Sequence, residues 1–231
     1  MNLVKPMLLA SLLVTSSAVT AQASKFQGGF GQFGIGYESV SPTSPTGSLT
    51  VNRLTLNANP SFSSSNSFAG TLAVGWYQDV AKGFLLGVGV EYSPFEGEKS
   101  SQTVRSSSLA PNQNNITNSY KWQKKNSYNI FISPAMTVGT DGLAYAKIGY
   151  TGAQAKQYDT LTYNFTGYSL GLGYKQVFSG GWYGFAEANY SSYGNQTKSA
   201  TNPISPGRTL TASGTNSLTS YNVLVGVGYK F

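Results

Sequence analysis

The stretch Tyr221–Phe231, YNVLVGVGYKF, decides the fold. Its residues alternate between two kinds of side chain, which is the period of a β-strand. One face carries Tyr221, Val223, Val225, Val227, Tyr229 and Phe231, and the other carries Asn222, Leu224, Gly226, Gly228 and Lys230. Bulky apolar residues opposite small residues predict a strand with lipid on its bulky side and a tight interior on the other.

Seven further segments show the same alternation of side chains and are rich in Gly and Tyr. With the last strand they are Gly28–Glu38, Phe68–Val80, Phe84–Ser93, Ser127–Val138, Leu143–Ala153, Phe165–Phe178, Trp182–Tyr193 and Ser220–Phe231. Each is longer than the usual strand of about 5–6 residues. Their lengths match or exceed the about 9–11 residues that a tilted strand needs to cross a bilayer.

The connections between these segments alternate in length. Three are minimal, namely AKG (81–83), TDG (140–142) and SGG (179–181), and each contains a Gly that can supply the positive φ of a tight hairpin turn. The other four, 39–67, 94–126, 154–164 and 194–219, are long and hold most of the Pro, Ser and Asn. Short turns therefore fall on one side and long loops on the other, which predicts one closed domain of four hairpins.

The first 23 residues have the pattern of a secretory signal peptide. Lys5 supplies a positive start, an apolar stretch follows from about Met7 to Val14, and Ala21-Gln22-Ala23 matches an A-x-A cleavage site. The apolar stretch is too short for a transmembrane helix, which needs about 20 residues. We expect cleavage after residue 23, Ser24 as the first mature residue, and a barrel domain over 24–231.

The composition is unlike that of a soluble globular domain. Charged residues make up 10% of the chain and aromatic residues 13%, whereas a soluble domain carries about 25% charged residues. The chain has no cysteine and no histidine. Zinc sites are therefore not expected, and we expect no metal and no cofactor.

Together these features resemble the small eight-stranded outer-membrane β-barrels of Gram-negative bacteria. That group includes the outer-membrane protein A transmembrane domain and the opacity-type surface proteins of the porin family. The resemblance is one of architecture, and the C-terminal alternation is its most specific part. It implies a location in the bacterial outer membrane. It also implies that the barrel-assembly machinery recognises the C-terminal signal Tyr221, Val223, Val225, Val227, Tyr229 and Phe231.

Ionisable side chains fall on the small-residue face of the predicted strands. They are Asp79, Glu91, Lys147, Lys175, Glu187 and Lys230. Eight strands enclose an interior just wide enough for side chains to fill, and lone buried charges are costly. We expect a neutral salt-bridge network that plugs the lumen. The alternative is that several of these residues lie near the rims, in water.

The segment GYSLG, residues 167–171, matches the G-x-S-x-G pattern of a nucleophile elbow. Such an elbow needs a strand–turn–helix context and a His partner. Ser169 falls within a predicted strand and the chain has no His. We interpret the match as chance and expect no catalytic residue. The lack of His also counts against the His-dependent barrel enzymes, such as lipid A-modifying acylases and surface proteases.

The long loops are basic on balance, and the second contains YKWQKK, residues 120–125. In an outer membrane the nearest anion is the phosphate of lipopolysaccharide. We expect Lys121, Trp122, Lys124 and Lys125 to contact it. A specific soluble ligand and a merely solvated strand extension are the alternatives, and nucleic acid is not an expected partner.

The prediction is an all-β chain forming one eight-stranded antiparallel up-and-down transmembrane β-barrel, expected to be a monomer. Both termini lie on the short-turn side, which we expect to be periplasmic, with the long loops extracellular and no peptidoglycan-binding domain after Phe231. The leading functional hypothesis is a non-enzymatic structural or surface-interaction role in adhesion or envelope integrity, with a host-surface or other extracellular ligand. A narrow channel for small solutes is the alternative, and an enzyme acting on lipids is a third.

Overall fold

The computed structural model describes residues 24–51, 54–106, 116–157, 161–205 and 208–231. These residues form ten strands: β1 (Gly28–Val51), β2 (Leu54–Phe62), β3 (Ser65–Ala81), β4 (Phe84–Ser93), β5 (Ser100–Ser106), β6 (Ile116–Val138), β7 (Gly142–Gln157), β8 (Leu161–Ser179), β9 (Trp182–Ser205) and β10 (Arg208–Lys230). In the described part of the chain, no helix has the length and apolar character to cross a membrane. The expected signal peptide lies outside the described residues.

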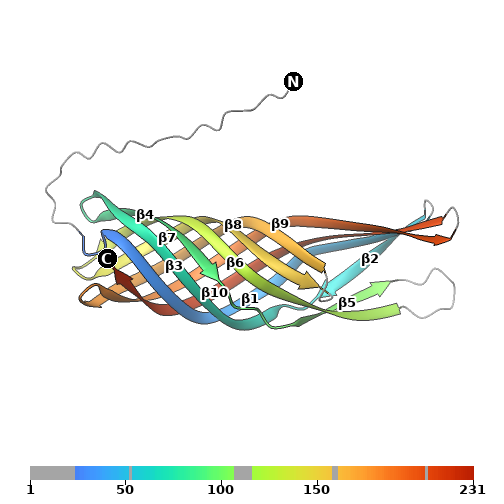
Figure 1. Ribbon diagram of the computed structural model, residues 1–231, viewed down its shortest axis with the longest axis horizontal. Helices are drawn as coiled ribbons and strands as arrows, with labels where there is room; N and C mark the ends of the chain where they lie inside the picture. The colour runs from blue at the N-terminus through green and yellow to red at the C-terminus, as the bar shows by residue number, and fades with distance from the viewer. Residues whose placement is uncertain (1–23, 52–53, 107–115, 158–160, 206–207) are drawn as a thin grey trace, which may run out of the picture.

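Eight of the strands form a closed antiparallel ring (Figure 1). Their order in the ring follows the chain, β1–β3–β4–β6–β7–β8–β9–β10, and β10 pairs with β1 to close it. A closed ring leaves no strand edge within the barrel, which allows strands to lie in lipid with their backbone groups paired. The predicted eight-stranded up-and-down barrel is confirmed.

Three short turns lie at the end of the barrel where β1 begins and β10 ends (left in Figure 1). Gly83, Gly180 and Gly181 have positive φ values of 77°, 50° and 91°, as expected for two of these turns. In the turn between β6 and β7, the positive φ of 65° belongs to Gly139, and the prediction that placed it at Gly142 is wrong. Gly142 begins β7, and a Cβ there would lie 2.5 Å from the Val138 carbonyl oxygen.

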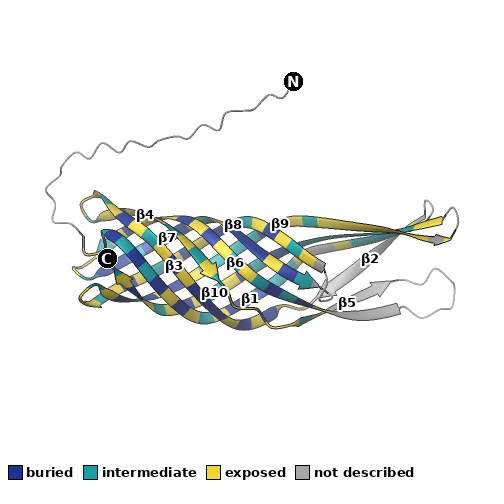
Figure 2. Cartoon of the chain, in the orientation of Figure 1, coloured by how far each residue is buried: buried dark blue, intermediate teal, exposed yellow. Residues whose placement is uncertain are grey.

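The outer surface of the barrel is apolar. Along β10 and the Phe231 that follows it, the alternate side chains from Tyr221 to Phe231 are 36% to 77% exposed, while Leu224 on the other face is fully buried. The same alternation of exposed and buried residues runs along the barrel strands (Figure 2). Soluble monomers rarely expose apolar patches beyond a few hundred Å², so this surface faces lipid.

A ring of aromatic side chains surrounds the barrel towards the end opposite the short turns. Each of the eight ring strands contributes one: Tyr37, Phe68, Tyr92, Tyr128, Tyr150, Tyr168, Tyr190 and Tyr221. They meet across strands, as in Tyr37 opposite Phe68. Near the short turns, Trp76, Trp182 and Phe231 are exposed. Aromatic side chains concentrate at membrane–water interfaces, so these two groups mark the borders of the lipid-facing band.

Beyond the aromatic ring the sheet continues, and here the sequence prediction is wrong. It assigns loops to residues 39–67 and 94–126, but β1 and β6 run through large parts of them and β2 and β5 are added. β9 and β10 extend in the same way (right in Figure 1). The extensions of β9 and β10 are rich in Thr and Ser, and residues 197–203 of β9 are exposed on both faces of the sheet. They therefore lack the apolar–polar alternation that identifies a half-buried strand.

An irregularity in the β6–β7 ladder changes which β6 side chains face the interior. The pairing steps from Ser127 opposite Ala153 to Lys124 opposite Ala155, so β6 advances by three residues while β7 advances by two. One extra residue moves every later side chain to the other face. Lys124 and Trp122 are therefore buried inside the barrel.

Candidate functional site

The lumen layer closest to the short turns holds a lysine among aromatic rings. Lys175 on β8 is 2% exposed. Its Nζ lies 4.0 Å from the ring centre of Phe30, 4.9 Å from that of Tyr183, 5.0 Å from that of Tyr77 and 5.2 Å from that of Tyr145. The faces of aromatic rings attract cations, so these four rings stabilise the ammonium group. Among the described residues Lys175 forms no ion pair.

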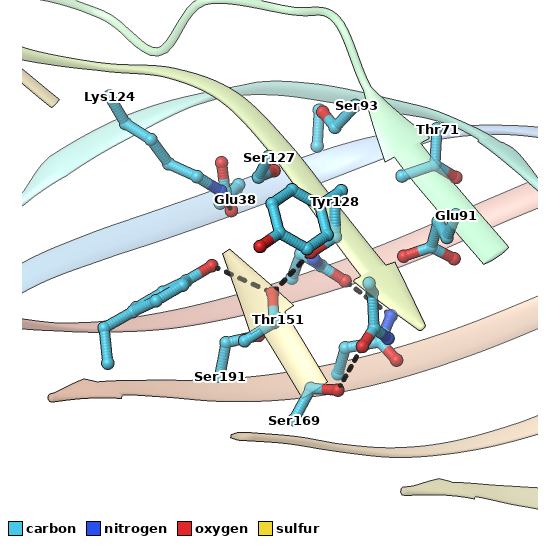
Figure 3. Close-up of a pocket in the computed structure, with 15 residues that line it drawn as sticks. Glu38, Thr71, Glu91, Ser93, Lys124, Ser127, Tyr128, Thr151, Ser169 and Ser191 are labelled. Atoms are coloured by element: carbon cyan, nitrogen blue, oxygen red, sulfur yellow. Dashed lines mark hydrogen bonds and ion pairs between the residues drawn. The ribbon is translucent and has the colours of Figure 1, made fainter. Parts of the chain in front are cut away.

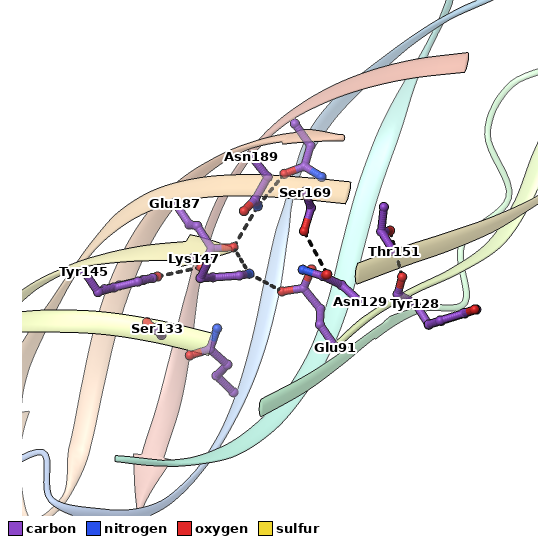
Figure 4. A network of polar contacts seen from close by, with 12 residues as sticks. Glu91, Tyr128, Asn129, Ser133, Tyr145, Lys147, Thr151, Ser169, Glu187 and Asn189 are labelled. Atoms are coloured by element: carbon purple, nitrogen blue, oxygen red, sulfur yellow. Dashed lines mark hydrogen bonds and ion pairs between the residues drawn. The ribbon is translucent and has the colours of Figure 1, made fainter. Parts of the chain in front are cut away.

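The middle layer is an ion-pair network centred on Lys147 of β7 (Figure 4). Its Nζ lies 2.8 Å from Oε2 of Glu91 and 2.7 Å from Oε1 of Glu187. Tyr145 Oη donates to Glu187 Oε2 at 2.7 Å, and Asn189 Nδ2 donates to Glu187 Oε1 at 2.7 Å. Both the ammonium and the Glu187 carboxylate thus have several partners, and the network joins the three strands β4, β7 and β9.

The next layer contains a second ion pair, between Lys124 of β6 and Glu38 of β1. Ser220 Oγ donates to Glu38 Oε1 at 2.6 Å. A small polar cavity is lined by both Lys124 and Glu91, and thus lies between the two ion-pair layers (Figure 3). Its other walls are mainly hydroxyl and amide side chains, including Thr71, Asn129, Thr151, Ser169, Asn189 and Asn222.

The outermost layer of the lumen is apolar. It is a buried cluster of Val40, Trp122, Ala153, Ala155, Phe165, Tyr193 and Leu218. Because it lies above the Lys124–Glu38 pair along β6 and β1, the polar cavity is bounded by side chains on both sides. Five layers therefore follow one another in the lumen from the short turns to the opposite end: an aromatic layer, an ion-pair layer, the polar cavity, a second ion-pair layer and an apolar layer.

The structure separates the six charges predicted for the lumen into three groups. Glu91, Lys147 and Glu187 meet in the network described above. Lys175 lies in the lumen, but among aromatic rings. Asp79 lies at the rim near the turns, where its Oδ2 accepts a hydrogen bond of 2.9 Å from the backbone N–H of Ser24. Lys230, the penultimate residue, is half-buried beside Gly28.

Glu38 and Lys124 belong to the lumen, but the sequence reasoning did not place them there. The first strand has the weakest alternation, which hid Glu38, and the β6 irregularity is invisible in the sequence. With this pair included, three carboxylates balance three ammonium groups inside the barrel. They are Glu38, Glu91 and Glu187 against Lys124, Lys147 and Lys175.

The predicted lipopolysaccharide contacts need a correction. Trp122 and Lys124 are 4% and 5% exposed and point into the barrel, so the prediction that they contact lipopolysaccharide on the outside is wrong. Lys125 pairs with Glu96, and the hydrogen bond from Lys125 lowers the pKa of the Glu96 carboxyl. Lys121 is exposed.

The G-x-S-x-G match does not build a nucleophile. Ser169 lies within β8, is 3% exposed, and its Oγ donates to Asn129 Oδ1 at 2.8 Å. Its hydrogen-bond partner is an amide oxygen, which is not a general base of the kind that activates serine. Within the described ranges, no group of three or more carboxylate, Cys or His side chains could hold a metal ion.

Comparisons with known proteins support the fold. No protein-family model matches the chain, and no curated protein matches it in sequence. Among solved structures, the outer membrane protein OprG from Pseudomonas aeruginosa is 14% identical with a TM-score of 0.55, and the match covers 90% of this chain and 98% of that one. The Escherichia coli outer membrane protease OmpT (10% identical, TM-score 0.49) matches over 93% of this chain and 100% of that one. The Yersinia pestis attachment invasion locus protein Ail (13% identical, TM-score 0.44) matches over 89% and 100%.

Identities this low show a shared fold and nothing about activity. The OprG match adds to what the molecule itself shows: a closed ring of eight strands, an exposed apolar belt and an aromatic ring with one side chain per strand. The chain is a small eight-stranded β-barrel of the bacterial outer membrane.

Proposed function

We propose that this protein is a non-enzymatic outer-membrane barrel with a sealed lumen, whose extracellular sheet binds a polar surface outside the cell. The observation that carries the proposal is the sheet that continues beyond the aromatic ring. Its three long strands, β9, β10 and β1, stay paired up to Arg208 opposite Ser205 and Val51 opposite Leu210.

One face of this extension is a grid of hydroxyl groups. Residues that lie opposite one another on β9, β10 and β1 form three rows: Thr197, Thr215 and Thr46; Ser199, Ser213 and Ser48; and Thr201, Thr211 and Thr50. Hydrogen bonds of 2.7 Å, 2.9 Å and 3.0 Å join the β9 and β10 members of the rows. Neighbouring strands lie about 4.8 Å apart and alternate residues about 7 Å apart, so the hydroxyl groups form a regular lattice.

A regular lattice of donors and acceptors suits a partner that repeats hydroxyl groups itself. A neutral polysaccharide has this chemistry, and side-chain hydroxyl groups can both donate to it and accept from it. The pairing of three strands and the cross-strand hydrogen bonds hold the lattice in place before a partner arrives. Such pre-organisation lowers the entropy lost on binding.

The lumen supports a structural role more than a channel. Small solutes would have to pass two ion-pair layers and the aromatic group around Lys175, with all three ammonium groups at most 5% exposed. Separating a buried ion pair is strongly unfavourable, so these layers resist the passage of ions and small polar molecules.

The surface role is tested by shortening the β9–β10 hairpin. Thr197 lies opposite Thr215 and Lys198 opposite Gly214, so deletion of 199–213 with Lys198→Asn leaves an Asn-Gly turn suited to a two-residue hairpin. Bacteria displaying this variant should be retained less than wild type on immobilised neutral polysaccharides such as agarose and dextran. A second variant, in which Thr197, Ser199 and Thr201 of β9 are all changed to valine, keeps the hairpin and should lose retention as well. Equal retention of all three strains would refute the surface role.

The remaining expectations about partners stay predictions. Lys121 lies on the outward side of β6 beyond the aromatic ring, where we propose that it meets the phosphates of lipopolysaccharide. Recognition of the C-terminal strand by the barrel-assembly machinery and a monomeric state are proposed on the resemblance alone.

A further inference from the structure

Residues 24–27, which precede β1, lie at the barrel mouth on the short-turn side (left in Figure 1). They form a tight turn, in which the Gln27 N–H donates to the Ser24 carbonyl oxygen at 3.0 Å. The Phe26 N–H donates to Ser24 Oγ at 3.2 Å. Ser24 therefore accepts two hydrogen bonds from within the segment, which we call the N-terminal latch.

The side chain of Phe26 anchors the N-terminal latch in the lumen. It is 4% exposed and belongs to the same buried cluster as Leu85 and Leu143. Its ring meets that of Tyr183 edge-on, with 6.3 Å between the ring centres. Tyr183 is one of the four rings around Lys175. Phe26 therefore extends the aromatic layer of the lumen towards the short turns.

Two polar contacts hold the N-terminal latch to different parts of the ring. The backbone nitrogen of Ser24 lies 2.9 Å from Oδ2 of Asp79 on β3. The Lys25 ammonium lies 2.5 Å from Oδ1 of Asp141, in the turn between β6 and β7. Together with the Phe26 anchor, these contacts fix the segment at three points across the mouth of the barrel.

The Asp79 carboxylate is aimed at the atom that the expected signal cleavage changes. Hydrolysis breaks the peptide bond before Ser24: the hydroxyl of a water molecule goes to the carbonyl carbon of residue 23, and its proton goes to the Ser24 nitrogen. The new acid loses a proton and the new amine gains one, because an α-amino group is mainly protonated at pH 7. A neutral N–H donor thereby becomes a cation, which adds the attraction of two opposite charges to the contact.

We propose that cleavage after residue 23 sets the N-terminal latch: the new Ser24 ammonium pairs with Asp79 and closes the mouth of the barrel at the short turns. The latch depends on this expected cleavage and is independent of the surface role proposed above. It is also specific for the position of the cut. With Phe26 in the lumen, each extra residue would move the ammonium by up to about 3.5 Å along the chain, away from Asp79.

The test compares two barrels in lipid nanodiscs that differ only in what precedes Ser24. One begins at Ser24 and carries the ammonium, and the other keeps residues 22 and 23 and has a peptide amide there. The readout is the hydrogen exchange of the Gln27 N–H, measured by NMR, because local opening of the latch exposes this group. Asp79→Asn should speed the exchange about 2- to 5-fold in the first barrel, the size of a partly exposed ion pair. In the second barrel the factor should be clearly smaller.

Matched controls separate the latch from general effects of the substitutions. Glu96→Gln removes a carboxylate that pairs with Lys125 at the other end of the barrel and should leave the exchange of Gln27 unchanged. Phe26→Ala removes the anchor and should speed this exchange in both barrels. Phe95→Ala, at a phenylalanine that is 42% exposed, should not.

The amino group itself can be followed by limited acetylation and mass spectrometry. In the barrel that begins at Ser24, the ion pair should slow acetylation of the Ser24 nitrogen. Asp79→Asn should therefore raise its rate about 2- to 5-fold, relative to the exposed Lys121 in the same molecule.

Three results would overturn the inference. They are an equal effect of Asp79→Asn on the two barrels, an exchange of Gln27 that is unchanged by Phe26→Ala, and a protein from outer membranes that begins at a residue other than Ser24. If Asp79→Asn fails to fold, as judged by heat-modifiable gel mobility, the two wild-type barrels still decide. Gln27 should exchange more slowly in the barrel that begins at Ser24, and equal rates would contradict the latch.

Discussion

Replacing Lys147 with methionine tests whether the ion-pair network holds the barrel together. The substitution keeps most of the side-chain volume and removes the charge. It leaves the carboxylates of Glu91 and Glu187 facing each other without their shared cation. Both are largely hidden from water, with side-chain exposures of 10% and 0%.

The magnitude follows from the distances. At 2.8 Å and 2.7 Å, each ammonium–carboxylate attraction is about 6 kcal/mol for an effective dielectric constant of about 20. The desolvation of the three charged groups offsets much of this electrostatic attraction. Breaking a buried pair by removing one partner costs about 3–5 kcal/mol, because the other charge stays buried without compensation. We expect the free energy of unfolding to fall by that amount.

The assay is reversible urea unfolding in lipid vesicles, followed by tryptophan fluorescence. Lys121→Met, on an exposed lysine, is the control and should change the unfolding free energy by less than about 0.5 kcal/mol. Adding Glu91→Gln and Glu187→Gln to Lys147→Met should restore part of the loss by removing the unpaired charges. A loss for Lys147→Met no larger than that for Lys121→Met would refute the assigned role of the network.

Two further predictions concern the backbone and the turns. Gly36→Ala should destabilise the barrel by about 3 kcal/mol or prevent folding, because its Cβ would lie 1.8 Å from the Val223 carbonyl oxygen. Gly31→Ala, whose nearest neighbour is 3.9 Å away, should be tolerated in the same unfolding assay. At the turn between β6 and β7, the hydrogen bond from Lys25 lowers the pKa of the Asp141 carboxyl. The stabilisation of the folded protein by the Lys25–Asp141 contact is therefore present at neutral pH and is lost as the pH falls through the lowered pKa of Asp141. In Lys25→Met, an NMR titration should show the pKa of Asp141 closer to its ordinary value, and an unchanged titration would contradict the contact.

The barrel could be predicted from the sequence because the lipid-facing signal is local. The six bulky residues from Tyr221 to Phe231 identify a strand and its outward face without knowledge of any partner. Short turns with Gly then set the connectivity. The same reasoning missed the extension of β9, because a strand exposed to water on both faces leaves no alternation to detect.

The lumen shows where local patterns stop being informative. Alternation placed Lys147, Glu187 and Lys175 inside, but their partners depend on how eight strands are staggered around the ring. Lys175 is held by rings from four other strands, which no linear pattern predicts. Lys124 was expected on the outside as part of a basic loop, but it lies in β6, where one extra residue turns its side chain into the barrel.

The sealed lumen is the central claim, and single-channel recording in planar lipid bilayers tests it most directly. The purified barrel, inserted in parallel with a general porin that verifies the recording, should give no current steps above those of the bare bilayer in 1 M KCl. Reproducible open steps from the wild-type protein would contradict the claim, because ions would then be passing the layers formed by Lys175, Lys147 and the Lys124–Glu38 pair.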